Sequence, residues 1–280
     1  FWNGFLEGTN PNNVSFFIEL FEKVFHSNII IENNYMNADI LCENACNIQD
    51  SFIYKKKWKY SIAVTGESVV SFGIFSDHFY HFSCFLSGLN TNISLRQIKF
   101  PLFISYIYCN KHLSLEPVDY IPKKMVCAII SNPKGNIRNK FLDKLEQKTE
   151  VVYGGSFRNN IGYNLQGDHN SIELINFMKQ FKFVITMENN KEDYYITEKI
   201  CNGFFSGIIP VYWGSSNIYE YFNSNRFLYL KDDSDQQINS IIERMINMDD
   251  TTYLNMIHSP ILVNNDLINP LVQNIQSILF

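Results

Sequence analysis

The sequence is poor in charge, and the charge it carries is slightly acidic. Charged residues make up 18% of the 280 positions, and 28 Asp and Glu against 23 Lys and Arg give a formal net charge of -5. Proteins that bind a nucleic-acid backbone normally present a dense Lys/Arg face. The composition therefore argues against a nucleic-acid partner. Any anionic ligand must be held locally, by a few cations and backbone amides.

Apolar runs long enough to cross a membrane are also absent. No stretch approaches the roughly 18 uninterrupted apolar residues that a transmembrane helix needs. No signal peptide is visible. The chain opens at Phe1 without Met, which leaves room for an upstream strand or anchor.

Metal-binding patterns are weak. The six cysteines include one close pair, Cys42 and Cys46, with no second pair to complete a zinc site. We interpret the cysteines as free or buried thiols, which favours a reducing compartment. His78 and His81 could share a helical face, but two histidines without a third ligand are typical of packing or surface positions. Asp233-Ser234-Asp235 has an Asp-x-Asp pattern, yet it lies in a polar turn that opens a helix, and we favour a capping role there.

Neither standard glycine-rich phosphate loop occurs, so ATPase and NAD-dependent functions lack their motif. Short apolar runs instead alternate with helix-period segments, as in parallel α/β proteins. The expected strands are 28–31, 38–42, 61–65, 72–75, 126–130, 150–153, 183–187, 208–212 and 226–230. The expected helices are 14–25, 137–147, 171–180, 197–205, 236–246 and 251–257. The aromatic, proline-interrupted stretch 97–117 is the expected linker between domains 1–118 and 119–280.

Polar residues gather where four of these strands end. In open α/β sheets, ligands bind beyond the carboxyl ends of the strands. The four junctions are Gly66–Ser68, Gly154–Arg158, Glu188–Asn189 and Gly214–Asn217. We therefore expect a binding site built from these turns.

The segment Tyr195–Lys199 (Tyr-Ile-Thr-Glu-Lys) is the most informative of the polar stretches. Thr197 is a plausible N-cap, so the amides that follow it and the helix dipole would attract a diphosphate, with Lys199 adding a full positive charge. The alternative is that Glu198 and Lys199 form part of a solvated helix face, which is the commoner fate of an isolated Glu-Lys pair.

Three linked blocks carry a family resemblance. Residues Phe183–Asn189 read Phe-Val-Ile-Thr-Met-Glu-Asn, Asp193–Lys199 read Asp-Tyr-Tyr-Ile-Thr-Glu-Lys, and Gly207–Gly214 read Gly-Ile-Ile-Pro-Val-Tyr-Trp-Gly. With their spacing, they closely resemble the signature of the α1,3/4-fucosyltransferases. The segments 131–133, 137–139, 154–159 and 162–164 look like the same family's donor domain, and the match runs from residue 126 to 255.

The first half resembles the family less closely but in the same order. Thr65–Ser68 resembles the acidic motif that holds the family's proposed catalytic base, and Arg96–Leu102 resembles the basic stretch before the linker. Phe1–Gly4 resembles the end of the first strand. Two departures matter: the bacterial pattern has Glu-Asn where this chain has Glu67-Ser68, and the carboxy-terminal Cys-x-x-Cys of animal members is absent. The second departure favours a cytoplasmic or peripheral membrane location over an animal-type Golgi lumen.

The resemblance implies a GT-B fold, in which two Rossmann-like domains face each other across a cleft. Residues 1–118 would bind the acceptor, and residues 119–280 would bind a GDP-sugar. Carried over position by position, the family's roles make Glu67 the catalytic base and place Arg158 and Lys199 on the diphosphate. The residues on the nucleoside and sugar would be Asn189, Tyr195 and Glu198.

The implied reaction is an inverting transfer of fucose from GDP-fucose to a hydroxyl of a glycan. An α1,3 linkage and a GlcNAc-containing acceptor, free or on a glycoprotein or glycolipid, would fit the family. The resemblance implies no tightly bound cofactor, and no divalent metal for binding, with stimulation of product release left open. Two alternatives stay open: the same fold with another GDP-sugar, and a non-catalytic glycan- or nucleotide-binding relative.

Overall fold

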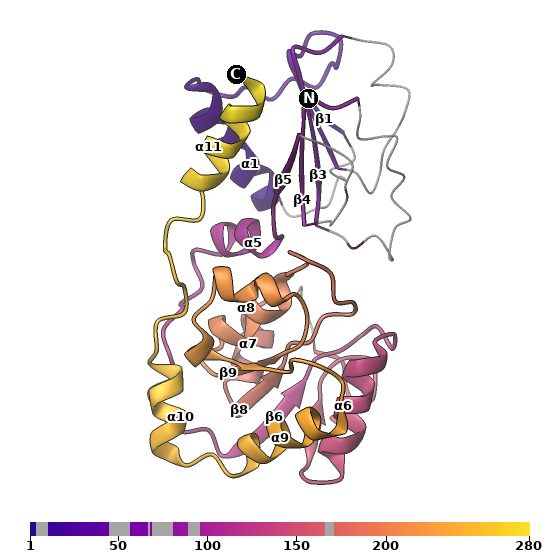
Figure 1. The fold of residues 1–280 in the computed structure, drawn as a ribbon, viewed down its shortest axis with the longest axis vertical. Coiled ribbons are helices and arrows are strands. Elements are labelled where there is room, and N and C mark those ends of the chain that lie inside the picture. Colours follow the sequence, from indigo (N-terminus) through magenta and orange to yellow (C-terminus); the bar gives the residue numbers. More distant parts are fainter. Residues whose placement is uncertain (4–10, 45–56, 67, 69–80, 89–95, 166–170) are drawn as a thin grey trace. The chain divides into compact units, whose positions relative to one another are not determined.

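The computed structural model describes residues 1–3, 11–44, 57–66, 68, 81–88, 96–165 and 171–280. By their contacts these residues form two units. The first comprises Phe1–Cys109, Glu192–Tyr195 and Asn265–Phe280, and the second comprises Asn110–Lys191 and Ile196–Asn264. Each unit has its own parallel sheet (Figure 1). Within the described ranges, every helix is too short or too polar to cross a bilayer.

The sheet of the first unit has its five described strands in sequence order, all parallel. They are β1 (Trp2–Asn3), β2 (Ile40–Asn44), β3 (Tyr60–Thr65), β4 (Cys84–Ser87) and β5 (Gln97–Lys99). Leu41, Ala63 and Phe85 form one buried cluster with Phe82, which explains why these short apolar runs pair.

Three helices of the first unit lie together beside its sheet: α1 (Pro11–Phe25), α5 (Phe103–Cys109) and α11 (Asn269–Leu279) (Figure 1). The α1 helix buries Phe16, Phe17, Leu20, Phe21 and Val24, a helical stripe along one face. The last helix packs against α1, and the Gln276 amide donates to the Val24 carbonyl at 3.0 Å. The chain thus returns to its first unit at the end.

Several expectations for the first half differ from the structure. Residues 28–31 form no strand, and 97–109, expected to be irregular, contain β5 and α5. The aromatic side chains of Phe100 and Phe103 are fully buried, so they belong to the core of the unit and not to a linker. The expected strand 72–75 lies outside the described residues.

The second unit follows the sequence predictions closely. Its parallel sheet has the strand order β10-β9-β8-β6-β7. The strands are β6 (Lys124–Ala128), β7 (Val151–Tyr153), β8 (Phe181–Ile185), β9 (Ile209–Tyr212) and β10 (Leu228–Tyr229). The central strands are almost continuously apolar because helices cover both faces of the sheet.

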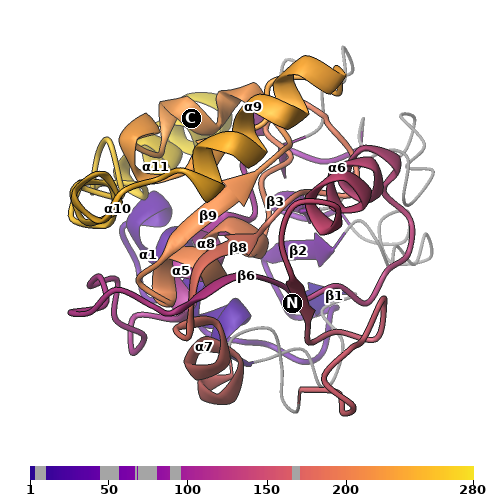
Figure 2. The same cartoon turned by 90° about the horizontal axis from the view of Figure 1, so that it is seen from below.

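The helices of this unit pair up on the two faces. The helices α6 (Asn136–Glu146) and α9 (Asp235–Ile246) contact each other, as do α7 (Ile172–Met178) and α8 (Glu198–Phe205). Figure 2 shows α6 and α9 on one side of the strands and α7 on the other. A final helix, α10 (Asp250–Ile257), follows α9. Ser171, Thr197, Ser234 and Asp249 cap the starts of α7, α8, α9 and α10 with their side chains.

Candidate functional site

The strand order of the second unit marks where a ligand should bind. From β6 the chain moves outward to β7, then crosses back over β6 to β8 and continues to β9 and β10. The direction of winding therefore changes between β6 and β8. In doubly wound α/β sheets, the crevice beyond the carboxyl ends of the strands at such a switch point is the usual ligand site.

Arg138 of α6 ties together the two loops at this switch point. Its guanidinium donates to the Asn189 side-chain oxygen at 2.8 Å, to the Asn132 carbonyl at 2.6 Å and to the Lys134 carbonyl. Arg138 is 2% exposed, and burial lowers the pKa of its side chain while the charge of Glu188 acts in the opposite direction. Arg138 thus connects the loop after β6 with the loop after β8.

A buried carboxylate, Glu188, organises the start of α8. Its oxygens accept hydrogen bonds from the Thr197 amide at 2.8 Å and from the Thr197 hydroxyl at 2.9 and 3.0 Å. The Lys199 ammonium donates to the same carboxylate at 3.0 Å. The Glu188 side chain is 0% exposed, and burial raises its pKa, although the charge of Lys199 opposes that shift.

The first turn of α8 is the positive end of a helix that starts at the switch-point side of the sheet. The Thr197 hydroxyl accepts from the Lys199 amide and also from the Lys199 ammonium, the latter at 3.0 Å. Glu198 lies 3.7 Å from the same ammonium. A partly exposed cation beside the amino terminus of a helix is an arrangement that binds phosphate groups.

The structure brings together part of the predicted donor set. Asn189, Glu198 and Lys199 lie in one network with Arg138 and Glu188. Tyr195 is 5% exposed and belongs to the first unit by its contacts. Glu67, the predicted base, lies outside the described residues, although the adjoining strand β3 ends at Thr65 as expected.

Arg158 has different neighbours from Lys199. Its guanidinium forms ion pairs with Asp143 at 2.5 Å and Glu146 at 2.8 Å, both on α6. Tyr153, at the end of β7, donates its hydroxyl to the same Glu146. The backbone of Arg158 has a φ of 58°, in the left-handed region that few non-glycine residues adopt. The two diphosphate cations expected from the family resemblance are therefore held by separate sets of carboxylates.

The sequence analysis placed Glu188 in a turn expected to form the site and Arg138 in a segment that resembles the family, but it gave neither side chain a role of its own. The sequence nevertheless carries a signal for both. Arg138 is followed by buried residues at helical spacing, namely Phe141, Leu142 and Leu145, so it lies on the inner face of α6. Glu188 comes three residues after the end of the apolar strand β8. A charged residue in such a position is buried only with a partner.

Metal ligation finds no support among the described residues, where no group of three or more His, Cys, Asp or Glu side chains could hold an ion. In the Asp-x-Asp pattern, Ser234 caps α9 through its hydroxyl. Asp235 forms ion pairs with Lys140 and Lys144 of α6 at 3.0 and 3.2 Å. These contacts join two helices on one face of the sheet.

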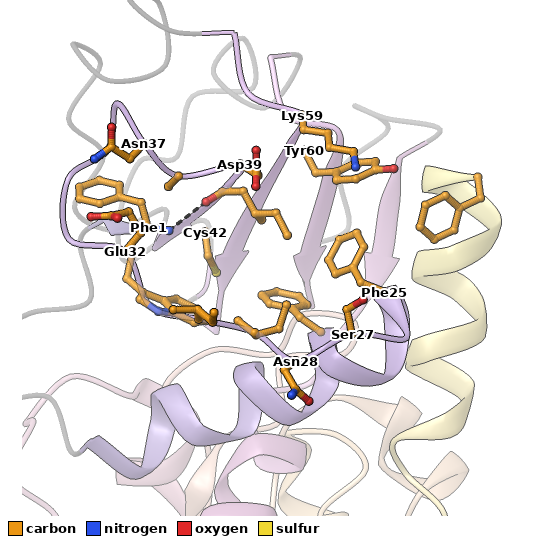
Figure 3. Close-up of a pocket in the computed structure, with 17 residues that line it drawn as sticks. Phe1, Phe25, Ser27, Asn28, Glu32, Asn37, Asp39, Cys42, Lys59 and Tyr60 are labelled. Atoms are coloured by element: carbon orange, nitrogen blue, oxygen red, sulfur yellow. Dashed lines mark hydrogen bonds between the residues drawn. The ribbon is translucent and has the colours of Figure 1, made fainter.

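A pocket of about 580 Å³ lies in the first unit, at the amino ends of its strands. Figure 3 shows its lining, which includes Phe25, Tyr60, Asp39 and Lys59. Ligands of parallel sheets bind at the carboxyl ends. This pocket is therefore not the candidate site.

Comparison with known proteins gives a family match over most of the second unit. Residues 121–258 match the model of glycosyltransferase family 10 (fucosyltransferase), C-terminal region. This span contains β6 to β10, the switch point and Lys199. Residues 121–258 are a glycosyltransferase family 10 domain.

Relatives of this family 10 domain bear fucosyltransferase names. The chain is 33% identical over 172 residues to the alpha-(1,3)-fucosyltransferase FucT of Helicobacter pylori, a match that covers 59% of this chain and 34% of the relative. It is 26% identical over 229 residues to the putative fucosyltransferase R654 of Acanthamoeba polyphaga mimivirus, covering 79% and 36%. The chain thus spans about a third of the length of these relatives.

Solved structures extend the likeness to both units. A crystal structure of an alpha1,3-fucosyltransferase with GDP-fucose superposes with a TM-score of 0.72 at 21% identity, covering 99% of this chain and 89% of the other. A second crystal structure of an alpha1,3-fucosyltransferase gives a TM-score of 0.74 at 20% identity and the same coverage. The predicted fold class, a GT-B type with two Rossmann-like α/β units, is confirmed.

Proposed function

We propose that this protein is an inverting fucosyltransferase that moves fucose from GDP-fucose to a hydroxyl of a glycan. The observation that carries the proposal is the Glu188–Thr197–Lys199 network at the switch point of a family 10 domain. A cation and a helix amino terminus there suit the diphosphate of a nucleotide sugar. The relatives' names and the structure with bound GDP-fucose support that donor.

The transfer reaction requires this site to stabilise negative charge on the leaving group. As the glycosidic bond breaks, negative charge develops on the leaving GDP while the sugar becomes oxocarbenium-like, by analogy with glycoside hydrolysis. Lys199 and the α8 amino terminus stabilise that charge where it forms. Arg158 contributes a second cation once the donor is bound. Asn189, Tyr195 and Glu198 contact the nucleoside and sugar.

An inverting reaction also needs one carboxylate that accepts the proton of the acceptor hydroxyl. Glu67 takes that role on the strength of the family resemblance of Gly66-Glu67-Ser68 and of its place just beyond β3. The acceptor contains GlcNAc, on an oligosaccharide, glycoprotein or glycolipid, in line with relatives named 4-galactosyl-N-acetylglucosaminide 3-alpha-L-fucosyltransferase 9.

The first experiment measures donor class by thermal shift and by transfer. GDP and GDP-fucose should raise Tm, because a ligand at a hundred times its Kd stabilises the folded state by about 2.7 kcal/mol. The product of transfer to N-acetyllactosamine should carry the anomeric configuration opposite to that of the donor, as determined by NMR. Stabilisation by UDP-sugars without any effect of guanine nucleotides would overturn the donor assignment.

The second experiment tests the base. Glu67→Gln should depress kcat while leaving the Kd for GDP near normal, and the acidic limb of the transfer pH profile should disappear. A variant that transfers fucose at the wild-type rate would show that another carboxylate is the base.

A further inference from the structure

We propose that Glu188 is the positioning residue of the donor site: it fixes both the Lys199 ammonium and the first turn of α8 for the diphosphate. This inference rests on the proposed function and deepens it. Glu188 itself stays buried and is not a catalytic residue. It acts through Lys199 and Thr197.

The contacts of the carboxylate are concentrated on one element. The carboxylate accepts hydrogen bonds from the Thr197 amide, the Thr197 hydroxyl and the Lys199 ammonium, at 2.8 to 3.0 Å. Thr197 is the N-cap of α8, and Lys199 is its second residue. One side chain from the end of β8 thus sets the position of the whole amino terminus of α8.

The side chains of Glu188 and Lys199 differ in how much of each is exposed to solvent. The Glu188 side chain is 0% exposed and the Lys199 side chain is 27% exposed. The ammonium therefore has the buried carboxylate on its inner side and faces the surface on the other. A flexible lysine loses much rotamer freedom when a ligand immobilises it. Holding Lys199 in place beforehand reduces the entropy that donor binding must overcome.

The charge of Glu188 has a second effect. It attracts Arg138 as well as Lys199. Its charge opposes the lowering of the Arg138 pKa by burial, and its carboxylate accepts from the Lys199 ammonium at 3.0 Å. A carboxylate between two cations offsets their mutual repulsion, so both can remain at the same end of the sheet. A neutral side chain of the same shape would keep the packing and lose this effect.

A purely structural brace for α8 would involve the same contacts, so the test must separate the two roles. We choose a double-mutant cycle of Glu188→Gln, Lys199→Ala and the double variant, read out as the Kd for GDP and as kcat and KM. Glu188→Gln alone should weaken GDP binding about tenfold, which is within the coupling energies measured for residues in contact. In the Lys199→Ala background the same change should have less than about a twofold further effect.

Asp249→Asn is the matched control, because Asp249 also caps a helix of the second unit with a carboxylate that accepts from an amide, at 2.7 Å from Thr252. It should leave GDP binding unchanged. Should Glu188→Gln fail to fold, Glu188→Asp replaces it in the cycle, since it keeps the charge and withdraws it from Lys199.

Two results overturn the inference. One is a cycle in which the factors by which the two single changes raise the Kd for GDP simply multiply in the double variant. Glu188 would then be a structural brace that acts independently of Lys199. The other is an unaltered Kd for GDP in a folded Glu188→Gln protein. Failure of the wild-type protein to bind GDP at all would instead overturn the proposed function, so the two failures are distinguishable.

Discussion

Arg138 and Glu188 are both almost completely buried at the end of one sheet, and neither lies on the surface that a ligand would touch first. Charged side chains are rarely buried without partners, because desolvation costs several kcal/mol per ion. Here each has several hydrogen bonds, and Glu188 pairs directly with Lys199. At the scale of single residues, the candidate site therefore combines a partly exposed cation, Lys199, with buried groups that hold it.

Lys199→Ala should lower turnover about a hundredfold or more, because it removes a charge that stabilises the leaving diphosphate. The same loss of turnover is expected for Arg158→Ala. Folding should change little, because the partly exposed ion pairs of Arg158 contribute at most about 1 kcal/mol to stability. Lys182→Ala is the control. Like Arg158, Lys182 pairs with an aspartate of the second unit, and its side chain is 20% exposed, close to the 22% of Arg158. Steady-state transfer kinetics and melting curves check all three. Wild-type rates in either site variant would remove that residue from the donor site.

The Glu188 carboxyl also predicts how stability varies with pH. Burial raises its folded-state pKa above the ordinary 4.5. Its contribution to folding is therefore fully present below the unfolded pKa and is lost as the pH rises through the folded one. The free energy of unfolding of the wild type, minus that of Glu188→Gln, should fall from pH 4.5 towards neutrality in urea titrations.

Asp249→Asn provides a contrast for the pH titration. Hydrogen bonds from Thr252 lower the pKa of Asp249 below its ordinary 3.8. Its contribution is present above that value and lost only as the pH falls through the lower folded pKa, so the corresponding difference should be flat above pH 5. A Glu188 difference that grows with pH would contradict the predicted direction.

At the scale of elements, two helices of the second unit have the same kind of N-cap, but the two caps have different neighbours. Ser171 caps α7 and Thr197 caps α8, each through a hydroxyl that accepts from a backbone amide. Only the Thr197 hydroxyl also contacts Glu188 and Lys199 among the described contacts of these two caps. One cap is thus local, and the other belongs to the candidate site.

Thr197→Ala and Ser171→Ala should each lower the free energy of unfolding by about 1 kcal/mol, the usual cost of a lost N-cap. Only Thr197→Ala should also weaken GDP binding, because it removes the hydroxyl that links Glu188 with Lys199. Chemical denaturation and calorimetric titration with GDP measure the two effects. Equal GDP affinities in the two variants would show that the α8 cap has no part in donor binding.

At the scale of the whole molecule, the chain crosses between its two units more than once. Residues Glu192–Tyr195 and Asn265–Phe280 belong to the first unit by contact, although they follow most of the second unit in sequence. The α11 helix buries Leu271, Val272 and Ile275 in that unit. The stability of the amino-terminal sheet therefore depends on the last residues of the chain.

Ile275→Ala should destabilise the first unit by about 2–5 kcal/mol, as for other fully buried large-to-small changes. Hydrogen exchange measured by mass spectrometry should show faster exchange in α1, β4 and β5, and unchanged exchange in 110–191. Ile242→Ala on α9 is the comparison in the second unit, because Ile242 is also buried, at 2% exposure; there the protection pattern should be the reverse. Faster exchange confined to 110–191 in Ile275→Ala would contradict this assignment of α11.

The sequence by itself determined most of the second unit. Its strands are short apolar runs, and α7, α8, α9 and α10 carry side-chain caps at their starts. Both signals are local, so they need no knowledge of distant residues. The motif blocks at 183–189, 193–199 and 207–214 indicated the family. They also contain Asn189, Glu198 and Lys199, which the structure brings into one network with Arg138 and Glu188. Thr197 was predicted as the N-cap, and the structure confirms it.

Only the tertiary structure decided which polar side chains meet. Arg138 and Asn189 are 51 residues apart in sequence, and their contact depends on β6 and β8 being neighbours. The same holds for α11, whose apolar stripe specifies burial but not against which unit. Apolar periodicity predicts that one face of a helix is buried, but it does not predict which element that face packs against. The packing partner depends on strand order and on the path of the chain.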